Sequence, residues 1–300
     1  MAWPTWQSAW HAALYGPEGF YRRPEGPAGH FRTAAHAAPD ELAAALGRLA
    51  AEHGCAALVD VGAGRGELLT ALAADGAPLR LYGVDVVGRP PGLPPEVGWS
   101  AGLSALPDDE LAGALVVCWE LLDVVPCPVL EVDGDGVPRN VHVEPSTGRE
   151  ALGAAAAEVD LAWRDRWWPG PSDEGDRIEI GRPRDELWAG LVRRTAAAAG
   201  GGVLLAVDYA HAAAARPPMG SLAGFRAGRQ VPPRPDGSMD VTAHVALDAV
   251  AAAGAAAGAR DTVLTTQQEA LQRLGTRNAE LLDAGSLGGF GWLLQRAGER

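Results

Sequence analysis

The clearest change in the hydrophobic pattern of the chain lies within residues 56–73. An apolar run ends at Val61, as is typical of a buried strand. Three glycines then alternate with other residues over 62–66, and apolar residues recur at helical spacing over 68–73. The order predicts a buried strand, a tight turn and a helix, and we expect the rest of the chain to be organised around them.

This turn has the features of a ligand site. Gly62, Gly64 and Gly66 lack a Cβ atom, so the backbone can turn sharply and a ligand can approach it closely. The helix that begins there directs unpaired main-chain N–H groups toward such a ligand. Asp60 precedes the turn, and a second apolar run ends in Asp85, where a second parallel strand would place a carboxylate beside the hydroxyl groups of a ribose.

The pattern Asp-x-Gly-x-Gly-x-Gly, followed by an acid after the second strand, resembles the S-adenosylmethionine site of class I methyltransferases. A dinucleotide site would share much of this pattern, and a strand–turn–helix that binds no ligand would also be compatible with it. The resemblance implies S-adenosylmethionine as the methyl donor and S-adenosylhomocysteine as the product. The residues expected to bind the cofactor are Asp60, Gly62, Ala63, Gly64, Gly66, Asp85, Val86, Leu103 and Glu120.

The N-terminal part of the chain has the pattern of helices. Three tryptophans and a leucine recur on one helix face between Trp3 and Leu14. This predicts either a helix packed on the core or a cap whose aromatic face covers the active site. A second helix is expected over 40–53, with Asp40 as its N-terminal cap.

The apolar run 111–117 predicts a further buried strand, after which come Trp119, Glu120 and Asp123. Ligands of this class of fold bind beyond the carboxyl ends of parallel strands, so these residues are expected in the cleft; the two acids could instead form a pair on the surface. Over 127–181 the pattern changes to short alternating segments around glycine turns, which predicts antiparallel strands. We expect this insertion to form a wall on the substrate side or to pack on the core.

The remaining third of the chain returns to the earlier alternation. A helical stretch is followed by a predicted strand over 203–207 and a long polar loop over 210–234. Another helix is expected to begin at Asp240, and residues 291–295 are expected to form a closing edge strand.

Together these patterns predict an α/β fold: a mostly parallel, Rossmann-like sheet flanked by helices, with an N-terminal helical cap and a β-rich insertion after the fourth strand. A length of 300 residues accommodates one large domain or two small ones. The expected segments are the cap at 1–50, the first part of the cofactor-binding core at 51–126, the insertion at 127–181 and the remainder of the core at 182–300.

The net charge of -13 argues against a nucleic-acid partner, because binding phosphates requires a basic surface. The sequence has neither an apolar run long enough to cross a bilayer nor the pattern of a signal peptide. The three cysteines lack the spacing of a metal site, and their odd number favours a reducing compartment. We therefore expect a cytoplasmic protein that binds no membrane and no metal; nothing in the sequence indicates its oligomeric state.

Several stretches of the chain, taken in order, resemble the MidA-type methyltransferases, which include the mitochondrial complex I assembly factor that methylates a protein arginine. The resemblance covers residues 15 to about 295 and implies a class I methyltransferase core with a protein arginine as acceptor. The matching stretches are 19–21, 30–34, 60–66, 120–126, Glu179, 208–209, 220–222, 240–245, 266–267 and 289–290.

Two kinds of acceptor chemistry fit these stretches. For an arginine acceptor, the carboxylates of Glu120, Asp123 or Glu179 could hold the guanidinium through paired hydrogen bonds. For an oxygen or small amine acceptor a base is more useful, and His30 and His244 are the candidates, although a lone histidine can also be structural. The expected catalytic residues are Glu120, Asp123, His30 and His244, and the expected acceptor-binding residues are Phe31, Thr33, Trp119, Glu179 and Tyr209.

The departures from the family pattern fall around the expected acceptor pocket. Trp119 replaces an asparagine, His30 replaces an aspartate, and Ala223 stands where an arginine usually occurs. The bulky Trp119 could close a peptide channel into a pocket, which would favour a small-metabolite acceptor over a protein arginine. The sequence is also compatible with a non-catalytic relative and, less well, with a redox enzyme that uses NAD.

Overall fold

The computed structural model describes residues 3–23, 34–170 and 173–298. The chain divides into two compact units, each assembled from three separate segments of the sequence. Unit 1 comprises residues 1–31, 123–187 and 210–250, and unit 2 comprises residues 32–122, 188–209 and 251–300. The predicted insertion therefore belongs to the same unit as the N-terminal helix and residues 210–250.

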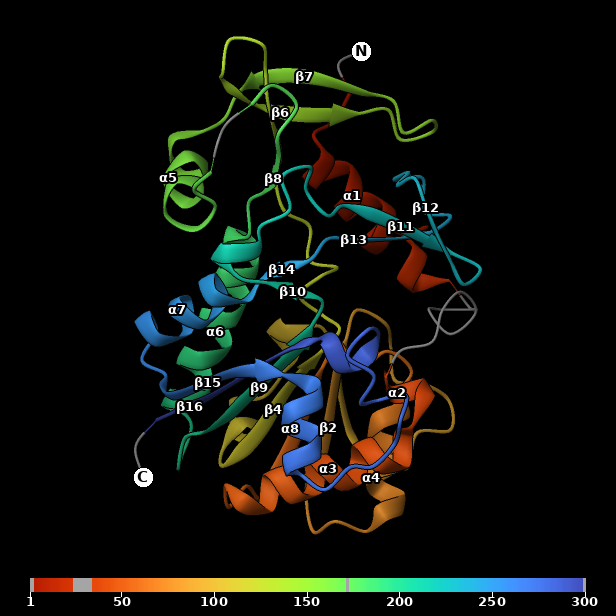
Figure 1. Cartoon of the computed structure of the whole chain (residues 1–300). Helices are drawn as coiled ribbons and strands as arrows, with labels where there is room; N and C mark the ends of the chain where they lie inside the picture. The colour runs from red at the N-terminus through yellow and green to blue at the C-terminus, as the bar shows by residue number, and fades with distance from the viewer. Residues whose placement is uncertain (1–2, 24–33, 171–172, 299–300) are drawn as a thin grey trace. The chain divides into compact units, whose positions relative to one another are not determined.

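Unit 2 contains a seven-stranded sheet with the order β15-β16-β9-β4-β1-β2-β3 (Figure 1). Five neighbouring strands are parallel, and only β16 pairs antiparallel with β9 and β15. This confirms the predicted mostly parallel, Rossmann-like sheet. The strands are β1 Ala57–Val61, β2 Arg80–Asp85, β3 Gly98–Ala101, β4 Ala114–Trp119, β9 Gly202–Asp208, β15 Arg260–Thr266 and β16 Gly291–Ala297.

The position of β16 corrects the expectation of a closing edge strand. Residues 291–297 lie between two strands, and every one of them pairs with β9, from Gly291 opposite Asp208 to Ala297 opposite Gly202. The edge is formed by β15 instead. Burial on both sides explains the apolar run at 292–294, a pattern that alone does not distinguish an edge from an interior strand.

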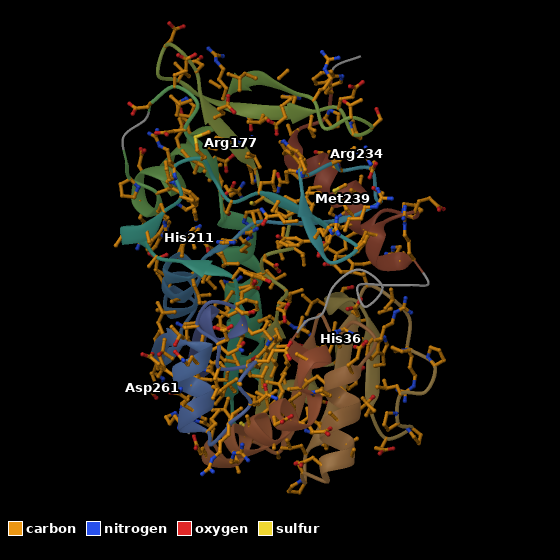
Figure 2. The ribbon with its side chains drawn as sticks, turned by 45° about the vertical axis from the view of Figure 1, so that its right-hand side comes forward. His36, Arg177, His211, Arg234, Met239 and Asp261 are labelled. Carbon is orange, nitrogen blue, oxygen red and sulfur yellow. The ribbon has the colours of Figure 1, made fainter. Side chains whose placement is uncertain are left out.

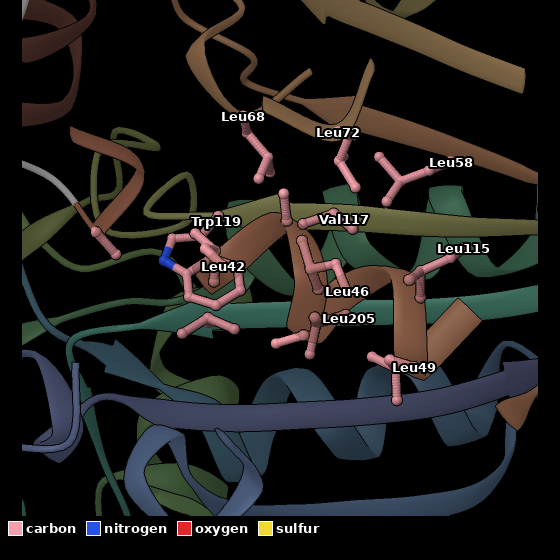
Figure 3. Close-up of a cluster of buried hydrophobic side chains, with 14 of the residues drawn as sticks. Leu42, Leu46, Leu49, Leu58, Leu68, Leu72, Leu115, Val117, Trp119 and Leu205 are labelled. Carbon is pink, nitrogen blue, oxygen red and sulfur yellow. The ribbon is translucent and has the colours of Figure 1, made fainter. Parts of the chain in front are cut away.

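One face of the sheet is covered by α3 (Pro39–Glu52) and α4 (Glu67–Asp75), with the short α2 (Ala34–Ala37) and α8 (Gln267–Arg273) contributing to the same cluster. Leucines that recur along α3 and α4 pack on the side chains of β1, β4 and β9 (Figure 3). The cap of α3 is Ala38, with a proline in the first turn, rather than the expected Asp40. Proline is suited to that position because its φ is already helical and its missing N–H has no intrahelical partner.

The opposite face of the sheet carries a buried polar contact. The amide of Gln295 on β16 accepts a hydrogen bond from Trp188 Nε1 at 2.7 Å and donates to the carbonyl oxygen of Ala251 at 2.8 Å. Trp188 belongs to α6 (Arg182–Ala197), and Ala251 belongs to α7 (Leu247–Ala256). The side chains of Trp188 and Gln295 are fully buried, so this hydrogen bonding is needed to satisfy the amide.

Unit 1 combines α1 (Trp6–Tyr15) and α5 (Glu158–Trp167) with small sheets, and so contains the predicted β-rich insertion. Arg177 ties its largest sheet together, because its guanidinium meets Glu150 at 2.9 Å and Glu131 at 3.7 Å (Figure 2). That sheet has the order β7-β6-β5-β8, and the others are β12-β11-β13 and the pair β10-β14. The strands are β5 Val129–Val132, β6 Pro138–Val143, β7 Glu150–Ala155, β8 Arg177–Glu179, β10 Ala210–His211, β11 Ala223–Arg226, β12 Arg229–Val231, β13 Asp240–Thr242 and β14 Val245–Ala246.

Two expectations for residues 210–246 are wrong. The predicted polar loop contains three short strands, and Asp240 begins a strand rather than a helix. The side chain of Asp240 accepts hydrogen bonds from the hydroxyl of Tyr21 instead of capping a helix. Val241 and Val245 are fully buried, so packing of these β-branched residues decides the local structure.

The core of unit 1 forms around α1. The predicted apolar stripe is confirmed for Trp6, Trp10 and Leu14, which are buried, whereas Trp3 precedes the helix. The indole N–H of Trp10 donates a hydrogen bond of 2.7 Å to the carbonyl oxygen of Val241. Among the helices of the described residues, none has both the length and the apolar character that crossing a membrane requires.

Candidate functional site

The glycine turn follows the carboxyl end of β1 and requires glycine at three positions. Gly62, Gly64 and Gly66 have φ values of +83°, +57° and +78°, in the left-handed region where other L-residues are strained. The N–H of Gly62 donates to the carbonyl oxygen of Val84 at 2.8 Å, which fastens the turn to β2. Gly66 is the N-cap residue of α4 (Glu67–Asp75).

The space around these glycines differs. A Cβ added at Gly66 would lie 2.6 Å from Leu93, so that position is closed by protein atoms. A Cβ added at Gly64 would meet nothing nearer than the carboxylate of Glu67 at 3.6 Å. The main chain at Gly64 is therefore open to the close approach of a ligand, as the turn motif predicts.

Asp85 stands at the end of β2 and contacts the turn directly. Its carboxylate accepts a hydrogen bond from the N–H of Gly64 at 2.8 Å and another from the N–H of Val87 at 3.2 Å. Burial raises the pKa of Asp85, and these main-chain hydrogen bonds partly oppose the rise. A carboxylate has about four acceptor positions, so Asp85 retains the capacity to accept hydrogen bonds from two ribose hydroxyls.

Asp60 is the most deeply buried acid of this turn, with 4% of its surface exposed. Within residues 3–23, 34–170 and 173–298, its carboxyl group has no side-chain hydrogen bond. Burial, reinforced by the charges of Asp85 and Glu67, raises the pKa of Asp60 to about 7. Three carboxyl groups thus lie near the turn, with the charge of Arg65 acting on Asp85 and His36 in contact with Glu67.

Glu67, in the first turn of α4, and His36, on α2, were not predicted as site residues. Glu67 accepts a hydrogen bond from the N–H of Arg65 at 3.1 Å and meets His36 at 3.3 Å (Figure 2). Burial alone would raise the pKa of Glu67, but the contact with His36 and the main-chain hydrogen bonds outweigh it and lower the pKa. The sequence could have indicated Glu67, because it is an acid in the first turn of a predicted helix, where a carboxylate interacts favourably with the helix dipole.

The remaining expected cofactor residues lie at the neighbouring strand end. Val86 follows Asp85 directly, and Ala101 of β3 is paired with Asp85. Leu103 begins the short helical turn that follows β3. Unit 2 therefore brings the predicted cofactor residues to the carboxyl ends of β1, β2 and β3, with Glu120 after β4.

Glu120 has a strained backbone. Its φ is +52°, one of three positive values among the non-glycine residues that the structure describes. Its N–H donates to the carbonyl oxygen of Val207 at 2.8 Å, and its carboxylate accepts from the N–H of Ala34 at 2.9 Å. Such strain costs of the order of 1–3 kcal/mol, and is concentrated at functional sites.

Trp119 belongs to the core of unit 2 (Figure 3). Its ring meets that of Trp292 edge to face, with 5.8 Å between the centroids. The buried indole N–H has no hydrogen-bond partner in the part of the chain that the structure describes.

Tyr209, also in unit 2, packs its ring on that of Phe290, with 4.1 Å between the ring centroids. Contact of Trp119 or Tyr209 with an acceptor stays a prediction.

The acceptor candidates of unit 1 include two buried acids. Asp123 and Glu179 are 4% and 2% exposed. The carboxylate of Glu179 accepts hydrogen bonds from the N–H of Ser221 at 3.0 Å and from its hydroxyl at 3.1 Å. A Cβ at the preceding Gly220 would lie 2.3 Å from Glu179, so the glycine permits this close contact.

His244 is joined to the same network through its main chain. Its N–H donates to the hydroxyl of Ser221 at 2.9 Å, and its carbonyl oxygen accepts from Arg184 at 2.8 Å. Although the residue is exposed, partial desolvation of its ring and the charge of Arg184 lower the pKa of His244. The predicted acceptor residues His30, Phe31 and Thr33 lie outside the described residues.

Unit 1 also holds an acid and a tyrosine that the sequence did not single out. The hydroxyl of Tyr21 donates to both carboxylate oxygens of Asp240 at 3.1 Å. Burial, followed by the charges of Asp240 and Asp123, raises the pKa of Tyr21 well above its ordinary value. Two buried aspartates therefore act on the same tyrosine, and the potential around it is negative.

Comparison with known proteins defines the class of this site. Residues 81–265 match the family described as "Putative S-adenosyl-L-methionine-dependent methyltransferase", and the chain belongs to that family. No match was found among the curated proteins.

Two solved structures share the fold over nearly the whole chain. A Burkholderia thailandensis protein bound to S-adenosyl-homocysteine is 25% identical, with a TM-score of 0.77, and the match covers 98% of this chain and 88% of that one. A native structure from the same organism and superfamily is 24% identical, with a TM-score of 0.75, and the match covers 98% and 87%.

The protein is thus an S-adenosylmethionine-dependent methyltransferase. This confirms the predicted cofactor and the resemblance of the chain to MidA-type methyltransferases. The residues of the turn fit this cofactor: Gly64 is open to a ligand, and Asp85 retains the capacity to accept further hydrogen bonds. When bound, the cofactor supplies a methyl group on a positively charged sulfur. Which atoms of the turn hold it stays a prediction.

Proposed function

We propose that the methyl acceptor is a guanidinium nitrogen of an arginine in a protein. The proposal is supported by the resemblance of the acceptor-side stretches to MidA-type methyltransferases and by the supply of carboxylates in those stretches. The observation that carries it is the left-handed backbone of Glu120, because this chain has a glutamate at a position where glycine would be less strained.

The buried acids of unit 1 give independent support. Asp123 and Asp240 are almost fully buried, and both act on Tyr21. Carboxylates beside a tyrosine ring suit a guanidinium, which keeps its charge, accepts no hydrogen bond and donates five N–H groups.

The reaction requires orientation and the removal of one proton. Carboxylates such as Glu120 hold the guanidinium through paired hydrogen bonds, so that one nitrogen points at the methyl carbon. That nitrogen forms a bond to carbon while the carbon–sulfur bond breaks, with both electrons going to sulfur. One proton then leaves the methylated nitrogen, and His244, kept neutral by its lowered pKa, is suited to accept it.

The acceptor class can be tested directly. The purified enzyme is incubated with methyl-labelled S-adenosylmethionine and either the dialysable or the macromolecular fraction of a cell extract. The expected result is label in protein, released as methylarginine by acid hydrolysis. The comparison is Glu120→Gln, which should transfer far less label, and calorimetry with S-adenosylhomocysteine shows how much of that loss comes from weaker cofactor binding.

A neutral, exposed His244 also favours a second candidate, a small oxygen or amine acceptor. Label that appears only in the dialysable fraction would support this candidate and contradict the arginine proposal. Label in protein that is released as a methylated residue other than arginine would contradict both acceptor assignments and leave the methyltransferase class intact.

A further inference from the structure

Arg184, in the first turn of α6, is a buried cation that binds main-chain carbonyl groups. It is 1% exposed. Its Nη1 donates to the carbonyl oxygen of His244 at 2.8 Å, and its Nη2 donates to that of Asp123 at 3.1 Å. Its Nε donates to Val125 at 3.3 Å, and the ring of Trp10 lies 5.9 Å from the guanidinium carbon.

Burying the charge of Arg184 costs desolvation free energy, so the position calls for an explanation. Among the described residues, no carboxylate forms an ion pair with Arg184 within 4.0 Å. The charge of Arg184 does lower the pKa of the neighbouring Asp185, but burial outweighs it and raises that pKa to about 7. A buried cation without a counter-ion has a large desolvation cost, and an apolar side chain of similar size would avoid it. The planar fork of arginine, however, can hold several carbonyl groups in a fixed arrangement, which an apolar residue cannot do.

We propose that Arg184 is a positioning residue of the acceptor half, which fixes the main chain at Asp123 and at His244 relative to one another. The inference rests on the proposed function, in which these two residues act on the acceptor. A direct hydrogen bond supports the same arrangement, since the N–H of Ala243 donates to the carbonyl oxygen of Asp123 at 3.0 Å. Two expected catalytic residues that are distant in sequence are thereby brought together within unit 1.

The charge of Arg184 has a second effect, on the imidazole of His244. Desolvation and then Arg184 lower the pKa of His244, which keeps the ring neutral and able to accept a proton. Two other titratable groups bear on this residue. His211 on β10 has a pKa lowered to about 3 and is uncharged at neutral pH, and Glu179 is hydrogen-bonded to Ser221, which accepts from the N–H of His244.

Two substitutions separate the geometry from the charge. Arg184→Lys keeps the cation but loses the planar fork, whereas Arg184→Met loses both. We expect kcat to fall by roughly 10- to 100-fold in both variants, with affinity for S-adenosylhomocysteine unchanged, because misplacement of about 1 Å can cost 100-fold. The pKa of His244, followed by the NMR signal that disappears in His244→Gln, should rise in Arg184→Met and stay low in Arg184→Lys.

The matched control is Arg182→Met, which removes a cation from the same helix where it pairs with Asp160 and Glu186. It should change neither kcat nor the pKa of His244. Wild-type kcat in Arg184→Lys would overturn the proposal, and this variant decides alone if Arg184→Met does not fold. If the wild-type enzyme methylates no arginine, the proposed acceptor is wrong, whereas the positioning role of Arg184 is judged separately, by kcat of Arg184→Lys on whichever acceptor takes the label. An unchanged pKa of His244 in Arg184→Met would refute only the effect of the charge.

Discussion

The carboxylate of Asp85 accepts a hydrogen bond from the main-chain N–H of Gly64 over 2.8 Å. The acid that ends the second strand therefore holds the loop that ends the first strand, while Gly64 itself stays open to a ligand. The two residues most characteristic of the cofactor motif thus act on one another before any cofactor binds. Perturbing either one should affect cofactor affinity more than folding.

Gly64→Leu should abolish cofactor binding while leaving the fold intact. The leucine side chain would occupy the open space above the turn, and affinity for S-adenosylhomocysteine in calorimetry should fall by more than about 100-fold, or about 2.8 kcal/mol. The matched control is Gly76→Leu, which has a similar φ of +74° and open space around it, but ends α4. Both variants should lose about 1–2 kcal/mol of stability from left-handed strain. Equal binding by both would show that the site is placed wrongly.

Asp60→Asn should change how stability depends on pH. The pKa of Asp60 is about 7 in the folded protein and 3.8 in the unfolded chain, so between these values only the folded state holds the proton. The free energy of unfolding therefore falls as pH rises from about 4 to 7, by up to roughly 1.4 kcal/mol per pH unit. It stays constant above that range as far as Asp60 is concerned.

The asparagine variant removes this contribution and should be more stable than the wild type at pH 8, in urea titrations without cofactor. The comparison must be made between the two proteins, because Asp185 also has a pKa raised to about 7 by burial and adds a slope of the same sign. Parallel stability curves for wild type and Asp60→Asn between pH 4 and 8 would refute the assignment.

Glu120→Gly and Glu120→Ala should differ in stability but not in activity. Both lose the carboxylate, so both should lose most methyl transfer. Glycine adopts a φ of +52° without strain and alanine does not, so the glycine variant should be more stable by about 1 kcal/mol in chemical denaturation. At an ordinary strand position the order would be reversed, and observing that reversed order would mean that Glu120 is not strained in solution.

Gly254→Ala should destabilise the protein by several kcal/mol, because the added methyl group would lie 1.9 Å from Gln295 Oε1 and 2.6 Å from Trp188 Nε1. It would therefore disrupt the buried hydrogen bond between these two side chains. Gly190→Ala in α6 is the control, since its added methyl group meets no atom within 4 Å. Alanine should stabilise that helix by about 0.5–1 kcal/mol, so the melting temperatures should move in opposite directions.

The cofactor half could be predicted from the sequence because its signals are local. The strand, the turn and the helix around Gly64 are adjacent in the chain, and Asp85 follows the next apolar run. The acceptor half could not be predicted in the same way. Arg184 binds main-chain carbonyl groups of residues about 60 positions away on either side. Because every residue has such a group, the sequence cannot indicate which ones an arginine will bind.

The errors in local structure have a similar origin. Residues 240–246 contain the β-branched residues Val241, Thr242 and Val245, but nothing within the segment decides between a helix and a strand. Burial of Val241 and Val245 in the core of unit 1 decides it. Likewise, an apolar stretch such as 291–295 predicts a strand but contains no information about its neighbours in the sheet.

The placement of β16 also constrains how the sheet can assemble. Its neighbours are β9 and β15, and β15 has no other neighbour in the sheet. When β15 leaves the ribosome, its partner β16 has not been synthesised. The edge of β9 that will pair with β16 is then still without a partner. The sheet is therefore completed late, when β16 inserts between β9 and β15. Its pairing with β9 joins residues far apart in the sequence, and we expect this step to make folding slow. Val263 and Leu264 of β15, which are exposed even in the folded protein, have no strand to pair with until then.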